Sequence, residues 1–174
     1  LAKANPGKLN VGNSATGSPP HIAAELLMLQ AELKFTHVPY SGASLPVQAV
    51  LGRTLDASST AVPPAQGLVE SGRLVGLAVT GERRWPGLPN VPTMIESGFP
   101  DFVVESTFAL FGPAGLPASI VQRLSAAVSE GLGKPEARAK ALATWFEARS
   151  AGADVLRNRI VTDAPKFKAL IERA

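Results

Sequence analysis

The stretch VGNSATGSPPHIAAELL, residues 11–27, joins an apolar start to a turn of small and hydroxyl residues and then to a helical pattern. Residues 8–12 alternate as a strand does. Ser18 suits an N-cap, and the two prolines after it suit a first helical turn, where a missing N–H costs nothing. Apolar residues then recur on one helix face, at Ile22, Leu26, Leu29 and Leu33. The order is strand, turn, helix.

The same order recurs farther along the chain. KFTHV (34–38), TLDASST (54–60) and RLVGLAVTG (73–81) are typical of strands, the last of them strongly apolar and buried. SLPVQAVLG (44–52) and PPAQGLVESG (63–72) are typical of short helices that end at glycine. Strands that alternate with helices indicate a parallel sheet with right-handed crossovers. We therefore predict an α/β fold with a mostly parallel sheet flanked by helices.

Beyond Thr80 the pattern changes. Residues 81–102 are rich in Gly and Pro and predict a loop with one short helix at 93–97. Residues 103–115 predict a long strand that leads into a turn. Three helices are expected at 117–132, 135 to about 146, and 153–173, the last kinked or broken at Pro165. These helices have no strands of their own to cover, so we expect their apolar faces to pack on a part of the protein that precedes Leu1.

Composition excludes several functions. The 174 residues are 45% hydrophobic, and the 17 Lys and Arg are scattered among 14 Asp and Glu, so nucleic-acid binding is disfavoured. The absence of cysteine excludes disulfides and thiolate sites, and the two histidines lie in separate segments, so we predict no metal site. No bilayer-length apolar run and no leader pattern is present. Because the chain starts at Leu1, we expect a processed or deliberately cut piece.

The turn at residues 12–18 has three candidate chemistries. Gly12 and Gly17 have the spacing of a phosphate-binding P-loop, but Ser18 and Pro19 follow where that motif needs lysine and a hydroxyl. A dinucleotide fingerprint fails because Ser14 takes the place of its second glycine. A nucleophile elbow fails because Thr16 takes the place of its last glycine. Ser14 and Ser18 nevertheless supply hydroxyls in this turn, so an acyl-handling or ester-cleaving enzyme that uses one of them is kept as the alternative function.

Anion binding requires no specific side chain of the kind that these motifs need. Small residues expose backbone N–H groups, hydroxyls can donate, and a helix N-terminus adds partial positive charge. PYSGAS (39–44) repeats this arrangement at the next strand end, and SSTAVPP (58–64) resembles it at the third. In a parallel sheet these turns share one edge, where open α/β sheets bind ligands. The three turns can equally be no more than connections between strands and helices.

Five ordered segments carry a resemblance to a known family: NPGKLNVGNSATGSPPHIAAELL, HVPYSGAS, LGRTLDASSTAVPPAQGLVESGRLVGLAVTG, RWPGLPNVPTMIESGFPDF and FGPAGLPASIVQRL. In this order they resemble the solute-binding receptors of tripartite tricarboxylate transporters, often called Bug proteins. The resemblance runs from about Ala4 to Leu132 and more weakly to the end. It implies a two-lobed periplasmic binding protein that closes on a small carboxylate, with no cofactor and with membrane transporter subunits as partners.

The resemblance also implies a division of the chain. Residues 1–104 resemble the second, ligand-closing lobe, and residues 105–174 resemble a crossover strand with C-terminal helices that return to the first lobe. The N-terminal part of that first lobe is then missing, and half of a binding cleft is present. Exposed helix faces on such a fragment lead us to expect self-association.

Ligand-facing positions are carried over from the family pattern. They are Asn13, Ser14, Ala15, Thr16, Gly17 and Ser18 in the first turn, Tyr40, Ser41, Gly42 and Ala43 in the second, and Ser59 and Thr60 in the third. Thr60 stands where many members have an aspartate that could pair with an ammonium group, which favours plain mono- or dicarboxylates over amino acids. Ala15 replaces a common glycine, and Ser41 replaces a common lysine. A lobe that serves only as a non-binding sensor or interaction module is a further alternative.

Overall fold

The protein is described by a computed structural model that covers residues 1–144, 146–148 and 150–171, with side chains up to residue 168 in the last helix. It divides into two compact units, Leu1–Ser106 and a second that begins at Thr107. The first unit carries all three predicted turns.

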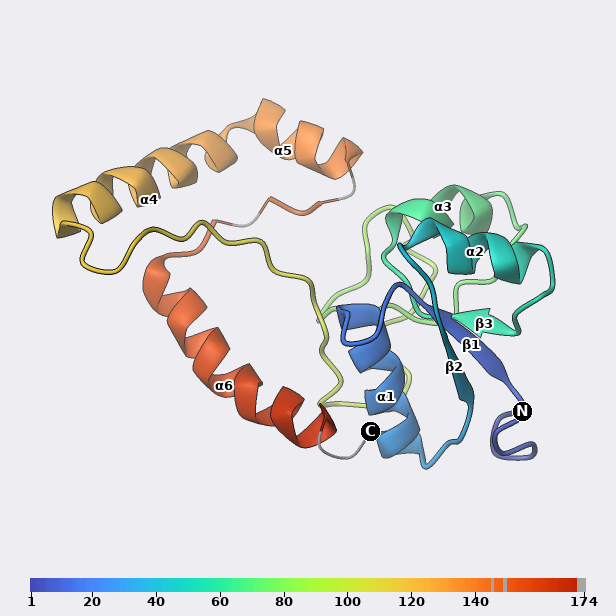
Figure 1. Ribbon diagram of the computed structural model, residues 1–174. Coiled ribbons are helices and arrows are strands. Elements are labelled where there is room, and N and C mark those ends of the chain that lie inside the picture. Colours follow the sequence, from blue (N-terminus) through green and yellow to red (C-terminus); the bar gives the residue numbers. More distant parts are fainter. Residues whose placement is uncertain (145, 149, 172–174) are drawn as a thin grey trace. The chain divides into compact units, whose positions relative to one another are not determined.

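The first unit is built on a parallel sheet of three strands in the order β2-β1-β3 (Figure 1). β1 (Asn10–Asn13) lies between β2 (Thr36–Pro39) and β3 (Ala57–Ser58). The register pairs Val11 with His37 and with Ala57. Helices α1 (Pro19–Ala31), α2 (Ser44–Leu51) and α3 (Pro63–Glu70) follow the strands in turn. The predicted α/β fold with a parallel sheet is confirmed.

Helix α1 begins where its local sequence predicts. The Ser18 hydroxyl accepts the N–H of His21, and Pro19 and Pro20 fill the first two positions. The helix ends at Ala31, because Glu32 adopts a left-handed conformation with φ 53°. Its N–H bonds the carbonyl of Met28, as in a left-handed C-cap.

Side chains of β1 alternate between two helical layers. A Cβ atom on Gly12 would lie 2.5 Å from Leu55 Cδ1 and 2.8 Å from Pro46 Cβ, so only glycine lets α2 approach the strand this closely. Asn13 points to the other layer, where it meets His37, whose ring contacts Glu25 of α1. The sheet therefore lies between α1 on one face and α2 on the other.

The hydrophobic core of this unit lies against α1. Phe102, Met94, Val104 and Ala23 form its buried cluster, with Leu26, Leu27, Ala78 and Phe99 packed around it. Phe102 is only 1% exposed, and it comes from the proline-rich loop. This loop therefore takes part in the core.

Residues 73–81 do not form the predicted buried strand. Within residues 73–81, Val79 alone forms a β-bridge, to Thr93, and the side chains of Val75 and Leu77 are 81% and 75% exposed. Leu74, Gly76 and Ala78 turn inward between them, and Val91 packs close to Gly76. The alternation predicted an extended chain correctly, but a strand also needs a neighbour to complete its hydrogen-bond ladder. The strand predicted at 54–60 is likewise confined to Ala57–Ser58 for want of longer pairing with β1.

The helix predicted at residues 93–97 is a single hydrogen-bonded turn. The N–H of Ser97 donates to the carbonyl of Thr93, and the turn continues no further as a helix. Thr93 and Glu96 close it reciprocally: Glu96 Oε2 accepts the N–H of Thr93, and Thr93 Oγ1 accepts the N–H of Glu96. This is a capping box. Gly98, with φ 98°, and Pro100 then stop the turn from extending.

The second unit contains α4 (Ala118–Gly133), α5 (Pro135–Ala143) and α6 (Ala153–Ile171). α5 ends before the predicted Phe146, where Thr144 closes it, and the predicted last residues of α6 lie outside the described range. Pro165 does not break α6. The carbonyl of Val161, which a residue with an N–H at position 165 would bond, belongs to a residue that is 68% exposed, so water can solvate it. Among described residues, no helix has the length and apolar character needed to cross a membrane.

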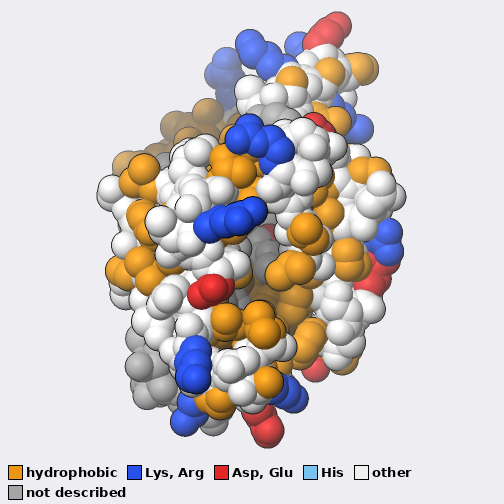
Figure 2. Space-filling model, turned by 90° about the vertical axis from the view of Figure 1, so that its right-hand side faces the viewer, with side chains coloured by type: hydrophobic (Ala, Val, Ile, Leu, Met, Phe, Trp, Pro, Cys, Tyr) orange, Lys and Arg blue, Asp and Glu red, His pale blue; other side chains and the backbone are white. Residues whose placement is uncertain are grey.

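Residues 103–115 are not the predicted long strand. Val104 is anchored through its N–H to the Thr80 carbonyl and through its carbonyl to Thr80 Oγ1. Beyond it Phe108, Leu110 and Phe111 are 71–77% exposed, and no described segment pairs with them in a ladder. Exposed hydrophobic side chains are also visible across the face drawn in Figure 2, interspersed with basic and acidic ones.

Candidate functional site

Hydrogen bonds join the three predicted turns at the carboxyl edge of the sheet. The N–H of Tyr40 donates to the carbonyl of Asn13 (2.9 Å), and the N–H of Gly42 donates to that of Ser14 (3.0 Å). Thr60 Oγ1 donates to the carbonyl of Ala43 (2.9 Å) and thereby ties the third turn to the second. The structure thus brings the three turns together.

Unused hydrogen-bond donors gather in the first turn. Within the described part of the chain, the backbone N–H groups of Ser14, Ala15 and Thr16 have no protein acceptor. Ser14 Oγ is buried and also without a partner. A buried hydroxyl left unpaired is costly, and such groups are uncommon in native proteins. Donors on consecutive residues around this hydroxyl are suited to an oxygen anion.

Later donors of the first turn serve the turn itself. The N–H of Gly17 donates to His21 Nδ1 (3.1 Å), and the Ser18 hydroxyl donates to the carbonyl of Ala15 (2.7 Å). Pro19 and Pro20 have no N–H, and the next one, of His21, is taken by Ser18. The first turn of α1 therefore offers an anion its dipole but no free N–H. The available donors are those of the loop that precedes Gly17.

The other predicted positions fall into different environments. Asn13 is fully buried beneath the loop, with its amide nitrogen 3.3 Å from His37 Nδ1. Tyr40 lies half-buried with its ring against Gly12, whereas Ser41 and Gly42 are exposed. Ser59 is half-buried, and its N–H bonds the carbonyl of Gly12. No side chain caps α2, so the N–H groups of its first turn donate to no capping side chain beside the exposed Ser41.

Neither serine of the enzyme alternative has a base beside it. Ser14 Oγ has no hydrogen-bond partner, and Ser18 Oγ is occupied by the carbonyl of Ala15 and the N–H of His21. His21 Nδ1 faces Gly17 instead of either hydroxyl. A serine nucleophile needs an adjacent base to activate it. The described residues provide none.

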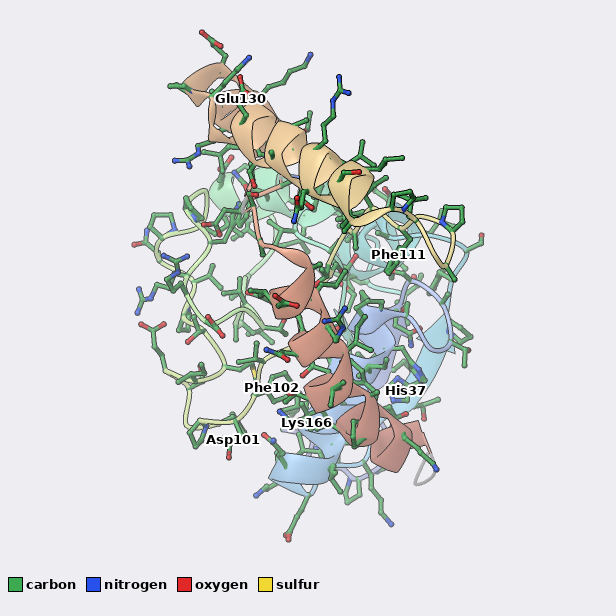
Figure 3. The ribbon with its side chains drawn as sticks, turned by 90° about the vertical axis from the view of Figure 1, so that its left-hand side faces the viewer. His37, Asp101, Phe102, Phe111, Glu130 and Lys166 are labelled. Atoms are coloured by element: carbon green, nitrogen blue, oxygen red, sulfur yellow. The ribbon has the colours of Figure 1, made fainter. Side chains whose placement is uncertain are left out.

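Sequence reasoning missed a cluster of three titratable side chains. His21 Nε2 lies 3.5 Å and His37 Nε2 lies 2.8 Å from the same Glu25 oxygen, and the imidazole rings are 4.7 Å apart. The position of His37 on β2 can be followed in Figure 3. Burial lowers the pKa of His37 and outweighs the negative charge of Glu25, which raises it. The ring therefore favours its neutral form. The four-residue spacing of His21 and Glu25 was visible in the sequence, but the approach of His37 depends on how α1 packs on the sheet.

Comparison with known proteins places this geometry in a family. The chain matches the tripartite tricarboxylate transporter family receptor over residues 1–174. It belongs to that receptor family. It is 30% identical over 171 residues to the UPF0065 protein in the tcbD-tcbE intergenic region of Pseudomonas sp. strain P51, which covers 98% of this chain and 51% of the relative. It is 32% identical over 149 residues to protein BugT of Bordetella pertussis, with coverages of 86% and 44%.

Solved receptor structures agree with the fold. A TctC solute-binding protein from Polaromonas superposes with a TM-score of 0.86 at 26% identity and covers 99% of this chain and 59% of its own. An R. palustris protein with adipate superposes with a TM-score of 0.80 at 26% identity. The match covers 98% of this chain and 57% of that protein's chain. MatC from Rhodopseudomonas palustris with bound malate superposes with a TM-score of 0.76 at 25% identity. The match covers 98% of this chain and 59% of the MatC chain. The family's periplasmic binding protein fold is therefore confirmed, and the chain spans about half the length of these relatives.

Proposed function

We propose that the turns after β1, β2 and β3 form one wall of a cleft that captures a small organic carboxylate in a periplasmic receptor. The observation that carries this proposal is the unpaired, buried Ser14 hydroxyl beside the free N–H groups of Ser14, Ala15 and Thr16. A carboxylate accepts several hydrogen bonds through its two oxygens, so one such group satisfies these donors together. Solved structures of similar proteins, one with adipate and one with malate, support this ligand class.

The ligand is a plain mono- or dicarboxylate in preference to an amino acid. The predicted ligand-facing positions contain neither a cation nor a carboxylate, so the donors are neutral and an ammonium group meets no opposite charge. Thr60, at the position that resembles an ammonium-pairing aspartate in relatives, gives its hydroxyl to Ala43. Bridging water completes the contacts that neutral donors leave open.

Capture is completed by the closing of two lobes. Residues 1–104 supply the lobe with the three turns, and residues 105–174 supply the crossover and helices that belong with the other lobe. The relatives are about twice as long as the matched segment, which leaves room for that other lobe. Closure presents a shape that transporter subunits in the membrane distinguish from the open form. This role involves no covalent chemistry, in agreement with the absence of a base beside Ser14 and Ser18 in the described chain.

The test is a titration of the ¹⁵N-labelled chain with malate, adipate and aspartate, followed by amide chemical shifts. Shifts detect weak binding, so a single wall of a cleft suffices. Malate or adipate should move the amides of Ser14, Ala15 and Thr16 first, with Ser41 and Gly42 following. Aspartate should act at higher concentration. Shifts that cluster elsewhere, or no saturable shift with either dicarboxylate, would count against the proposal.

A further inference from the structure

The side chains of His21, Glu25 and His37 offer one ligand atom each within 4.8 Å of one another. The carboxylate oxygen lies 3.5 Å from one imidazole nitrogen and 2.8 Å from the other. Ligand atoms around a tetrahedral transition metal lie about 3.3 Å apart, which follows from metal–ligand distances of about 2.0–2.1 Å. The two distances to the carboxylate lie on either side of that value, and the two imidazole ligand atoms lie within 4.8 Å of each other, so rotation of the imidazole side chains is needed to complete the geometry.

Two buried atoms in this region lack hydrogen-bond partners. His37 Nε2 is close to Glu25 Oε1, yet the pair is not aligned as a hydrogen bond, and Asn13 Oδ1 has no donor. Exchanging the oxygen and nitrogen of the Asn13 amide would place Oδ1 against His37 Nδ1, so that Nδ1–H could donate to it. The His37 Nε2 lone pair would then face the carboxylate, an arrangement that a proton or a metal ion between them stabilises.

We propose that His21, Glu25 and His37 form a binding site for a divalent transition metal ion, with Zn²⁺ as its preferred type. Two imidazoles and one carboxylate leave a fourth tetrahedral position for water. Asn13 is the positioning residue that orients His37, as carboxylates and carbonyls do for other metal-bound histidines. The three ligand side chains are 15–18% exposed, so the cluster lies just beneath the surface. The site is separate from the free donors of Ser14 and does not depend on the proposed carboxylate function.

Metal binding at His21 has a consequence for the first turn. His21 Nδ1 accepts the N–H of Gly17, so the proton of the neutral ring is on Nε2 without metal. A metal on Nε2 moves the proton to Nδ1, which can then no longer accept from Gly17. Zn²⁺ therefore releases the N–H of Gly17, the residue directly after the free donors. The metal site and the loop are coupled through this one bond.

The test uses the complete chain, purified without a histidine tag and freed of metal, in buffer without carboxylates. The chain contains two histidines and no cysteine, so imidazole ligation can come only from His21 and His37. Calorimetry with Zn²⁺ should show one ion per chain. Long-range ¹H–¹⁵N spectra of the histidines should show both Nε2 resonances and the Gly17 amide moving with Zn²⁺.

Variants assign the ligands. His37→Gln and Glu25→Gln should each weaken Zn²⁺ binding by at least about tenfold, the smallest effect expected for a partner in a metal site. The control is Glu130→Gln, which removes one carboxylate from the exposed surface of α4 (Figure 3) and should leave Zn²⁺ affinity unchanged. Circular dichroism checks that each metal-free variant is folded, and the spectra of the unaltered chain decide the matter if one is not. No saturable Zn²⁺ binding, wild-type affinity in folded His37→Gln, or bound Zn²⁺ with an unmoved Gly17 amide overturns the proposal.

Discussion

The hydroxyl of Thr60 donates to the carbonyl of Ala43 across 2.9 Å, and this bond fastens the turn after β3 to the turn after β2. Thr60→Val keeps the shape of the side chain and removes the donor. Because the Ala43 carbonyl then loses its partner in a half-buried place, we expect the free energy of unfolding to fall by about 1 kcal/mol. Urea denaturation of both proteins measures the difference.

Thr60→Ser serves as the matched control for that experiment, since it retains the hydroxyl and loses only a methyl group. It should preserve more stability than Thr60→Val. Equal losses in the two variants would show that packing of the methyl group, and not the hydrogen bond, holds the turns together.

Ser14→Ala should separate binding from stability. Ser14 Oγ is buried and bonds nothing in the protein, so its removal should leave the free energy of unfolding unchanged or raise it. Dicarboxylate binding should weaken by about 1–2 kcal/mol, the scale of one hydrogen bond to a charged group. The concentration of malate at half-maximal amide shift measures this effect.

Ser18→Ala is the contrasting variant in the same turn. Its hydroxyl caps α1 and bonds Ala15, so its loss should lower the free energy of unfolding by about 1 kcal/mol. A Ser14→Ala variant that destabilises the fold as much as Ser18→Ala would show that Ser14 has a structural role.

Gly12 should tolerate no side chain. The added Cβ of Gly12→Ala meets Leu55 at 2.5 Å and Pro46 at 2.8 Å, and the ring of a proline in α2 cannot rotate away. Overpacking of this kind costs about 1–3 kcal/mol. Thermal unfolding should show a clear fall in midpoint.

Gly67→Ala gives the comparison within the same unit. Gly67 lies in α3 with no atom within 4 Å of an added Cβ, so alanine should raise stability by about 0.5–1 kcal/mol through its helix propensity. Opposite signs for the two glycines are expected, and a neutral Gly12→Ala would mean that α2 can move away from β1.

Elements whose signals lie within a few residues of one another were predicted correctly, and several elements that depend on distant partners were not. Helix α1 was predictable because Ser18 and the prolines act within one turn. The strand predicted at residues 73–81 was wrong because alternation indicates only an extended chain. A strand also requires a partner strand, which no local pattern identifies. Residues 103–115 failed for the same reason beyond Val104.

For the candidate site, the sequence predicted which turns meet, because parallel strands end at one edge. It could not predict which donors stay free. The Gly17 N–H is taken by His21, and this follows from the packed position of an imidazole ring. The meeting of His37 with Glu25 depends likewise on the crossing of α1 over β2, which no spacing in the sequence encodes.

Glu96 should make stability depend on pH. The hydrogen bond from Arg84, and then that from the Thr93 N–H, hold the pKa of Glu96 below its ordinary value. Between this lowered pKa and the ordinary carboxyl pKa, the unfolded chain binds more protons than the native one, so stability falls as pH falls through this window. Urea midpoints between about pH 5 and pH 2 should show the fall, and Glu96→Gln should lessen it.

The size of this effect is limited because both side chains are 45% exposed, and added salt should reduce it further. Arg84→Gln is the control, since it removes the strongest cause of the lowered pKa and leaves the Thr93 bond. Because the folded-state pKa of Glu96 then moves closer to the ordinary carboxyl pKa, the loss of stability on acidification should be smaller in Arg84→Gln and should end at a higher pH than in the unaltered chain. An identical pH profile for Arg84→Gln would mean that the turn at Thr93 alone sets the pKa of Glu96.

The chain should self-associate through its extended apolar segments. Val75 and Leu77 are 81% and 75% exposed on a segment that bonds to no strand of the described sheet. An unpaired extended segment with an apolar face pairs readily with another chain, because pairing completes its hydrogen bonds and buries its side chains. Sedimentation velocity should show an average mass that rises with concentration.

Leu77→Lys tests whether this segment is the one responsible. A charge there should lower self-association, since burying an unpaired ammonium group is costly. Val161→Lys is the matched control: it adds the same charge at a 68% exposed position of α6, where the backbone is helical and presents no strand edge. Equal effects of the two lysines would point to net charge as the cause, and a monomer at every concentration would refute self-association altogether.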